Sequence, residues 1–205
     1  SLNESNSINI FDKIYAELSL IRINSDLEDQ LKTDKINNLL DKIKNLDLQS
    51  IEIIDSSISA FSNNIKIDFE KLKSEILEEK IKIMIKIEDE PQKIVNTIME
   101  CIEIKSHISV NDKEGMAQLF KDLGSVYVRI NNIDEALKYF DKSIILSKQI
   151  GNKYIEIINR IKKGNILFNQ NKQDLAKKEY ENAYAKNYDD IELKYSIIIG
   201  LLKTA

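Results

Sequence analysis

Residues 120–143 read FKDLGSVYVRINNIDEALKYFDKS, and residues 160–183 read RIKKGNILFNQNKQDLAKKEYENA. When the two segments are aligned on Gly124 and Gly164, forty residues apart, they share residues of the same type at fixed offsets. The matching pairs are Asn131 with Asn171, Asp134 with Asp174, Ala136 with Ala176, Lys138 with Lys178, Phe140 with Tyr180 and Ser143 with Ala183. Small residues at fixed offsets indicate helices in close contact, and a period of this length is typical of a stacked helical array.

The chain has the composition of a globular protein rather than a disordered or membrane-spanning one. Its 205 residues are 42% hydrophobic and 31% charged, which is enough to bury a sizeable core. No apolar run approaches the roughly 18 residues that a membrane span needs, and the first residues lack the pattern of a secretory signal. A single cysteine, Cys101, excludes an internal disulfide and fits a reducing compartment. We therefore expect a cytoplasmic protein that does not bind membranes.

Neither the charge pattern nor the side-chain chemistry points to nucleic-acid binding or catalysis. Residues 1–63 have a net charge of −5 (6 Lys and Arg against 11 Asp and Glu), and residues 111–205 are only mildly basic. His107 is the single histidine, which excludes a histidine-based metal cluster or triad, and Cys101 falls in an apolar helical stripe that favours burial. The sequence has no phosphate-binding loop, nucleophile elbow or zinc motif. We expect no enzyme activity, no cofactor, no metal and no nucleic acid bound by this chain itself.

Apolar residues recur at helical spacing along most of the chain, as in Ile14, Leu18 and Ile21. All five glycines lie after residue 114, and the single proline is Pro91, so helix-breaking residues are scarce. The sequence therefore predicts an all-α fold of about ten helices joined by short turns. The expected ranges are 7–23, 26–45, 48–62, 65–88, 91–108, 112–130, 133–150, 152–170, 172–187 and 189–204.

Capping signals support several of these boundaries. Ser25, Asn111 and Asn132 each precede a glutamate by three residues, which is the spacing of an N-terminal capping box. Pro91 fits the first position of a helix, where its missing N–H group needs no partner. Gly151 suits the end of one helix, and Asn152 suits the start of the next.

The order of residues in the first copy resembles a tetratricopeptide repeat. Its matching positions are Phe120, Leu123, Gly124, Tyr127, Ala136, Phe140 and Ser143. The second copy keeps the positions Gly164, Ala176, Tyr180 and Ala183. It departs from the pattern at Lys163, which precedes the glycine, and at Leu167, which replaces the tyrosine, while a third copy opens at Gly200.

The resemblance implies a right-handed α-solenoid of antiparallel helical hairpins. We expect residues 1–64 to form divergent hairpins that are continuous with the array, and residues 65–205 to form tetratricopeptide-like repeats. The best matches span 112–150 and 152–187, and a truncated or capping helix is expected at 189–205.

The resemblance also implies a ligand-binding face, because the first helices of such repeats line the concave side of the array. It places five residues there: Lys121, Ser125, Arg129, Asn165 and Asn169. Asparagine offers a donor and an acceptor to a peptide backbone, and lysine or arginine can hold a carboxylate. Since lysine and asparagine are abundant along the whole chain, a solvated face is the alternative. A chaperone-type carboxylate clamp is not expected, because Ser125 replaces one asparagine and Ile161 is apolar.

Repeats of this longer period look similar to those of regulatory scaffolds and of the peptide-pheromone-sensing regulators of Gram-positive bacteria. The resemblance implies a module that binds a peptide or a protein segment, as the ligand-sensing part of a bacterial regulatory protein. A constitutive scaffold or chaperone-type adaptor for a protein partner is the alternative. A DNA-binding domain of such a regulator would lie outside these residues, and a homodimer is compatible with either function.

Overall fold

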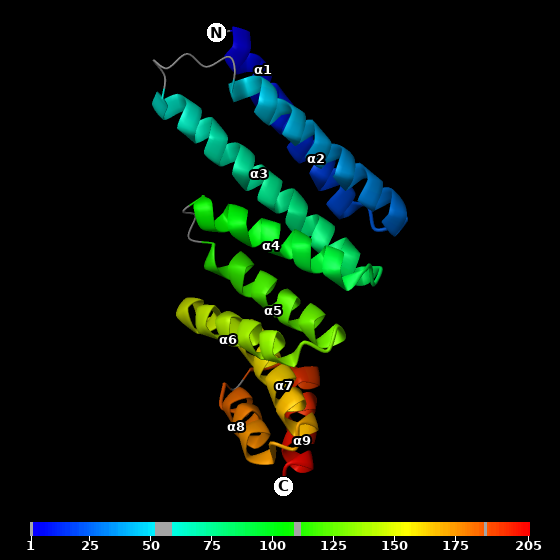
Figure 1. Cartoon of the computed structure of the whole chain (residues 1–205), viewed down its shortest axis with the longest axis vertical. Helices are drawn as coiled ribbons and strands as arrows, with labels where there is room; N and C mark the ends of the chain where they lie inside the picture. The colour runs from blue at the N-terminus through cyan, green and yellow to red at the C-terminus, as the bar shows by residue number, and fades with distance from the viewer. Residues whose placement is uncertain (1, 52–58, 109–111, 187) are drawn as a thin grey trace. The chain divides into compact units, whose positions relative to one another are not determined.

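The computed structural model describes residues 2–51, 59–108, 112–186 and 188–205, which contain nine α-helices and no strand (Figure 1). The helices are α1 Leu2–Ile23, α2 Asp29–Ile51, α3 Ser59–Lys86, α4 Pro91–His107, α5 Lys113–Arg129, α6 Ile133–Ile150, α7 Lys153–Asn169, α8 Gln173–Tyr184 and α9 Ile191–Lys203. The predicted all-α fold is therefore confirmed for this part of the chain. Of the helices described, none is both long and apolar enough to cross a membrane.

The expected count of ten helices is wrong for the described residues, because the predicted helix at 48–62 does not exist as a separate element. Residues 48–51 end α2, residues 59–62 begin α3, and residues 52–58 lie outside the description. Helix α3 continues through Ser62, Asn63 and Asn64, where the expected ranges leave a gap. Serine and asparagine weaken a helix interior by less than about 0.7 kcal/mol each relative to alanine, so they do not have to end it.

Capping contacts confirm several of the predicted boundaries. Asn132 Oδ1 accepts a hydrogen bond from the Glu135 N–H at 3.4 Å, and Asn152 Oδ1 accepts one from the Ile155 N–H at 3.1 Å. Pro91 is the first residue of α4. Gly151 ends α6 with φ 72°, a left-handed conformation that glycine adopts without strain.

Two of the predicted caps need correction. Helix α2 begins at Asp29, four residues after Ser25, and the Ser25 hydroxyl contacts Asp26 Oδ1 at 3.1 Å instead of capping a helix. Helix α5 is capped by Asp112, whose Oδ1 accepts the Gly115 N–H at 2.8 Å, while Asn111 lies outside the described residues. Adjacent polar residues compete for the cap position, so the spacing alone does not select one.

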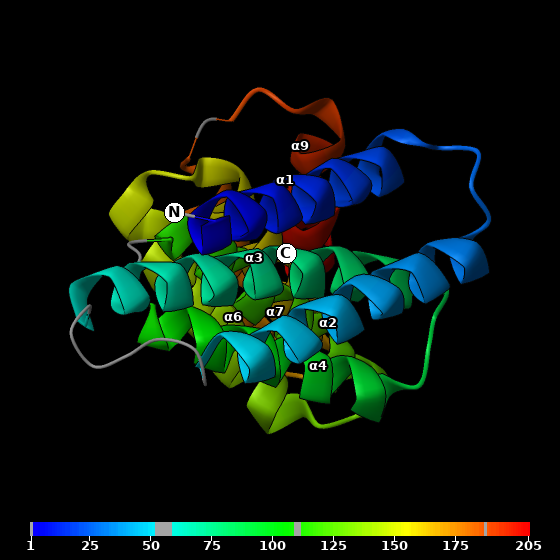
Figure 2. The same cartoon turned by 90° about the horizontal axis from the view of Figure 1, so that it is seen from above.

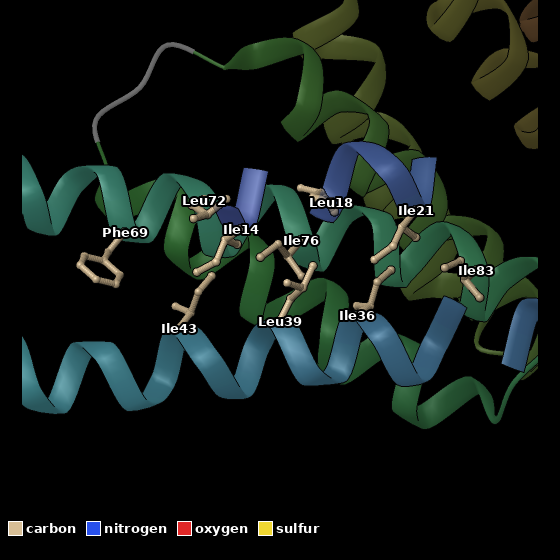
Figure 3. Close-up of a cluster of buried hydrophobic side chains, with 10 residues drawn as sticks. All are labelled: Ile14, Leu18, Ile21, Ile36, Leu39, Ile43, Phe69, Leu72, Ile76 and Ile83. Atoms are coloured by element: carbon tan, nitrogen blue, oxygen red, sulfur yellow. The ribbon is translucent and has the colours of Figure 1, made fainter. Parts of the chain in front are cut away.

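Residues 1–110 form one compact unit. In it, α1, α2 and α3 run alongside one another, as Figure 1 and, from above, Figure 2 show. Their apolar stripes meet in a buried cluster (Figure 3). The cluster consists of Ile14, Leu18 and Ile21 of α1, Ile36, Leu39 and Ile43 of α2, and Phe69, Leu72, Ile76 and Ile83 of α3. Helix α4 packs on α3 and buries Cys101, whose Sγ lies 3.6 Å from the Ser74 carbonyl oxygen, which confirms the expected burial.

Residues 111–205 form the second compact unit, and its glycines lie where helices are closest. A Cβ atom on Gly124 of α5 would lie 2.7 Å from the Phe140 ring of α6. A Cβ atom on Gly164 of α7 would lie 2.6 Å from the Tyr180 ring of α8, and Gly200 of α9 approaches the same ring. The prediction that these glycines mark close helix contacts is confirmed. The sequence also predicts that divergent hairpins give way to regular repeats at residue 64. The chain divides into its two compact units at 110/111 instead, and the predicted change at residue 64 stays a prediction.

The turns after α5 and α7 have the same geometry, which explains the matching asparagines of the repeat. Asn131 and Asn171 adopt positive φ values of 58° and 60°. The N–H group of the following residue, Asn132 or Lys172, donates to the carbonyl of Tyr127 or Leu167 at 2.9 Å in both turns. Asparagine tolerates this left-handed position better than most residues, so it can end a helix where glycine is absent.

Candidate ligand-binding face on α5 and α7

Polar side chains of α5 and α7 meet where these two helices contact one another. Gln118, Lys121 and Asp122 come from α5, and Lys162 comes from α7. Gln118 Nε2 donates to Asp122 Oδ2 at 3.1 Å, and Lys121 Nζ lies 3.4 Å from Asp122 Oδ1. All four residues are half-buried. We call these four residues the α5–α7 polar cluster.

The charges of the α5–α7 polar cluster do not balance. Lys121 and Lys162 contribute two positive charges, and Asp122 contributes a single negative one. Burial lowers the pKa of Lys162, repulsion from Lys121 lowers it further, and attraction to Asp122 opposes both effects. Within the described part of the chain, no hydrogen-bond acceptor or ion-pair partner is found for the Lys162 ammonium group. A further anion at this position would therefore stabilise the charged form of Lys162.

Asp122 is itself poorly stabilised as an anion. Burial raises the pKa of its carboxyl group, although Lys121, the Gln118 amide and Lys162 each lower it. Its carboxylate is already held by Gln118 and Lys121. One carboxylate in this position cannot neutralise two ammonium groups.

The hydrogen bonds and ion pairs of Lys121, Ser125 and Asn165 limit what these predicted ligand-binding residues can offer a ligand. Lys121 belongs to the α5–α7 polar cluster. The Ser125 hydroxyl donates to the Lys121 carbonyl oxygen at 2.9 Å, so only its acceptor capacity is left. Asn165 Oδ1 accepts a hydrogen bond from the Tyr180 hydroxyl at 2.8 Å, which leaves the amide Nδ2 as a donor. Asn165 can therefore still donate to a peptide carbonyl group, while its Oδ1 already accepts from Tyr180.

The other two predicted residues lie at helix ends. Arg129 is the last residue of α5 and Asn169 is the last residue of α7, and both are exposed. The forty-residue period relates them, as it relates Ser125 to Asn165. The five residues thus lie on the two helices that contact each other, and their role as ligand contacts stays a prediction.

The sequence patterns did not single out Gln118, Asp122 and Lys162 as candidate site residues. Asp122 and Lys162 each lie two residues before a glycine of the repeat, so the forty-residue period makes them equivalent positions. Equivalent positions of neighbouring repeats lie near each other in a stacked array, and this signal was available in the sequence. The half-burial of Lys162 could not be predicted from the sequence, because it depends on the packing of α5 against α7.

The next residue along α7, Lys163, has the opposite environment. Its ammonium group pairs with Asp141 of α6 and lies 3.0 Å from Glu179 Oε1 of α8. Burial opposes its charge, but the hydrogen bonds to Asp141 and Glu179 outweigh burial and raise the pKa of Lys163. Of these two consecutive lysines, Lys163 makes structural contacts, and Lys162 is the one that has no ion-pair partner among the described residues.

Lys163 belongs to a larger network of paired charges on α6, α7, α8 and the turn that follows α8. Arg160 Nε lies 3.1 Å from Glu156 Oε1, and its Nη1 lies 2.7 Å from Glu179 Oε2. Lys186 Nζ also reaches Glu156 Oε1, at 2.9 Å. With Asp141 included, the network contains three positive and three negative residues. It has no excess charge to offer a ligand, and we interpret it as structural.

The first unit contains a groove of about 350 Å³ between α2, α3 and α4. Four apolar residues make one part of its lining, and three lysines, three acidic residues and Thr97 line the rest. The apolar residues are Leu40, Ile43, Phe69 and Leu77. Lys73 and Glu100 pair within it at 2.9 Å. A balanced, partly paired lining gives no preference for one class of ligand, so the α5–α7 polar cluster is the stronger candidate site.

A comparison of the sequence with models of known protein families finds no match, and a comparison with curated protein sequences finds no relative. The resemblance to tetratricopeptide repeats therefore stays a prediction. The geometry of the α5–α7 polar cluster is the main guide to function.

Proposed function

We propose that this protein is a peptide-binding module whose α5–α7 polar cluster holds a carboxylate of the ligand. The main support is the Lys162 ammonium group, half-buried beside Lys121, with Asp122 as the acidic member of the cluster. A carboxylate between the two lysines would supply the missing negative charge. In a peptide this group is either the C-terminal carboxylate or an Asp or Glu side chain.

The remaining residues of the two helices suit the backbone of an extended peptide. Asn165 Nδ2 and the Asn169 amide can donate to peptide carbonyl groups, and the Ser125 hydroxyl oxygen can accept from a peptide N–H. Arg129 at the end of α5 offers a further site for an acidic or carbonyl group. The site differs from a chaperone-type clamp because it uses Lys162.

The proposed architecture is a right-handed solenoid of antiparallel, tetratricopeptide-like hairpins. Contacts between α5 and α6 support the hairpin, because they run in opposite order along the two helices. The Ser143 hydroxyl donates to the Ala117 carbonyl at 2.6 Å, whereas Tyr127 stacks on Tyr139 with ring centroids 5.5 Å apart. The contact of Gly124 with Phe140 and that of Gly164 with Tyr180 support a repeated unit.

The favoured biological role is the ligand-sensing part of a bacterial regulatory protein, and the alternative is a constitutive scaffold. A sensor requires that the peptide favour one of two conformations. Amide hydrogen exchange with bound peptide should then change in helices outside the site, such as α3 and α4. For a scaffold, the change should be confined to α5 and α7 and their immediate neighbours.

The carboxylate proposal can be tested with three matched peptide arrays. The first has free C-terminal carboxylates, the second has C-terminal amides, and the third has Asn and Gln in place of Asp and Glu. Peptides that bind the first array should lose affinity in the second or the third, which identifies the source of the carboxylate. Equal binding to all three arrays would exclude a carboxylate as the recognised group.

Variants of the cluster make the same test residue by residue. Lys162→Met should weaken binding of an isolated peptide by about tenfold or more, since a hydrogen bond to a charged group contributes about 1.5–3 kcal/mol. Asp122→Asn should strengthen binding, because it removes the carboxylate that competes with the ligand. Lys177→Met, on the exposed surface of α8, is the control and should leave affinity unchanged. Binding that is indifferent to Lys162→Met would place the site elsewhere.

A further inference from the structure

Helix α9 is apolar on two opposite faces. Its inner face packs against α7 and α8 through Ile197, Leu193 and Leu201, and Gly200 lies against the Tyr180 ring. Its outer face is exposed: Ile191 by 82%, Tyr195 by 68%, Ile198 by 45%, Ile199 by 40% and Leu202 by 71%. A helix that is apolar on all but a narrow polar strip is typical of one that is buried on both sides.

The exposed residues form one continuous face. Ile191, Tyr195, Ile198 and Leu202 follow one another at intervals of four, three and four residues, which keeps them on the same side of a helix. Ile199 lies beside them. Fully exposed side chains of this size present on the order of 100–200 Å² each, so the measured exposures correspond to roughly 300–600 Å² of apolar surface. This area is at the upper end of what monomeric proteins expose.

Two charged residues border this face in a self-complementary arrangement. Glu192 and Lys203 are eleven residues apart and therefore lie on the same edge of the face, about 16 Å apart along the helix. When two copies of α9 pack face to face in antiparallel directions about a two-fold axis, Glu192 of each copy lies opposite Lys203 of the other. The same arrangement sets Ile191 opposite Leu202, and Tyr195 opposite Ile198 and Ile199. Among the described residues, neither Glu192 nor Lys203 has an ion pair within its own chain.

We propose that the outer face of α9 is a homodimer interface, in which two copies pack α9 against α9 in antiparallel directions. The apolar surface from each copy, together with Glu192, Ser196 and Lys203 at its edge, approaches the roughly 800 Å² per partner of a small specific interface. The dimer therefore buries an apolar face that is otherwise exposed to water, and its two ion pairs fix the antiparallel orientation. This interface does not depend on the proposed peptide site, because α9 contributes none of the residues of the α5–α7 polar cluster.

Sedimentation of the full chain over a dilution series tests the interface. We expect a reversible monomer–dimer equilibrium between about 1 and 200 µM, because interfaces at the small end of the specific range are generally weak. Leu202→Glu should weaken the dimer by a hundredfold or more, while Leu175→Glu on the exposed surface of α8 should leave it unchanged. Both positions are exposed, so the unfolding midpoints of the two variants should match that of the wild type at concentrations low enough for the wild type to be monomeric. A chain that stays monomeric throughout, or a dimer that Leu202→Glu does not weaken, overturns the proposal.

A charge exchange tests the orientation. Glu192→Lys alone and Lys203→Glu alone should each weaken the dimer by about tenfold at low salt, because each variant creates two like-charge contacts. The double variant should restore wild-type affinity, which a parallel or unrelated contact would not predict. Flotation with vesicles of phosphatidylcholine and phosphatidylglycerol tests whether this apolar face binds a lipid surface instead of a second copy of the chain. A wild-type chain that is monomeric but binds vesicles through Leu202 identifies a lipid surface instead of a second copy and refutes the dimer.

Discussion

Replacing the two consecutive lysines of α7 should have opposite effects on stability. Lys163→Met removes the partner of Asp141 and one of the partners of Glu179. Complete loss of a partner from a buried ion pair costs about 3–5 kcal/mol. Here Asp141 is half-exposed and can be rehydrated, and Glu179 keeps Arg160 at 2.7 Å. We therefore expect a smaller loss, about 1–2 kcal/mol, or about 2–8 °C in the unfolding midpoint of a chain of this size.

Lys162→Met should not lower the midpoint and is expected to raise it at neutral pH. Burial and the neighbouring Lys121 disfavour the ammonium form of Lys162, so its pKa is lower in the folded state than in the unfolded state. A methionine of similar length keeps the packing of the side chain and removes the charge.

The sign of the pH dependence follows from this lowered pKa. The folded state binds the Lys162 proton less tightly than the unfolded state, so the destabilisation by its charge is complete below the folded pKa. It disappears as pH rises through that value toward the unfolded pKa near 10.5. The advantage of Lys162→Met over the wild type should therefore be largest at pH 7 and should shrink toward pH 10. Circular dichroism melts of the wild type and both variants at several pH values give this comparison. A loss of stability in Lys162→Met equal to that in Lys163→Met, or a difference independent of pH, would refute the assignment of the two lysines.

Three other variants or measurements probe the second unit. Gly124→Leu and Gly164→Leu should each lower stability by about 1–3 kcal/mol, because the new side chains overlap the Phe140 and Tyr180 rings; unchanged melting midpoints would contradict the helix contacts. Asn165→Ala should lower stability by about 1–2 kcal/mol in the wild type, because the substitution leaves the Tyr180 hydroxyl unpaired. The loss should be smaller in a Tyr180→Phe background, and equal losses in the two backgrounds would show that this hydrogen bond does not contribute to stability. The chain should not bind duplex DNA at about 150 mM salt, because its charges form no concentrated basic patch, and sub-micromolar affinity in an anisotropy titration would exclude this view.

The repeated segment predicted the close helix contacts of the second unit well because its positions are fixed by local packing. Gly124 and Gly164 are needed where an aromatic ring approaches the helix backbone, and Asn131 and Asn171 are needed where the chain turns with positive φ. Such requirements act within one or two helices, so they are visible as fixed offsets in a sequence.

Boundaries in the first unit were predicted less well, since there the sequence has few residues that force a chain to turn. Helix α3 continues through Ser62, Asn63 and Asn64, and Ser25 has the spacing of a cap without being one. These polar residues are compatible with a helix, a cap or a turn, and packing against neighbouring helices decides between them. Glycine and proline are absent from this part of the chain until Pro91, where the prediction is again confirmed.

The candidate site shows a different limit, because it depends on which of two similar residues finds a partner. Lys162 and Lys163 are identical in type and adjacent in sequence, and neither the helical period nor the repeat predicts that only Lys163 reaches Asp141 and Glu179. Charged residues of α7 therefore take part in two different groups. Those around Arg160 form a network with equal numbers of positive and negative residues, and they stabilise the packing of α6, α7 and α8. Those around Lys162 leave one half-buried positive charge for which the described residues supply no ion-pair partner, and burial of this charge destabilises the folded chain. A bound anion would neutralise this charge, so the proposed site predicts that the peptide affinity of Lys162→Met falls while its stability rises.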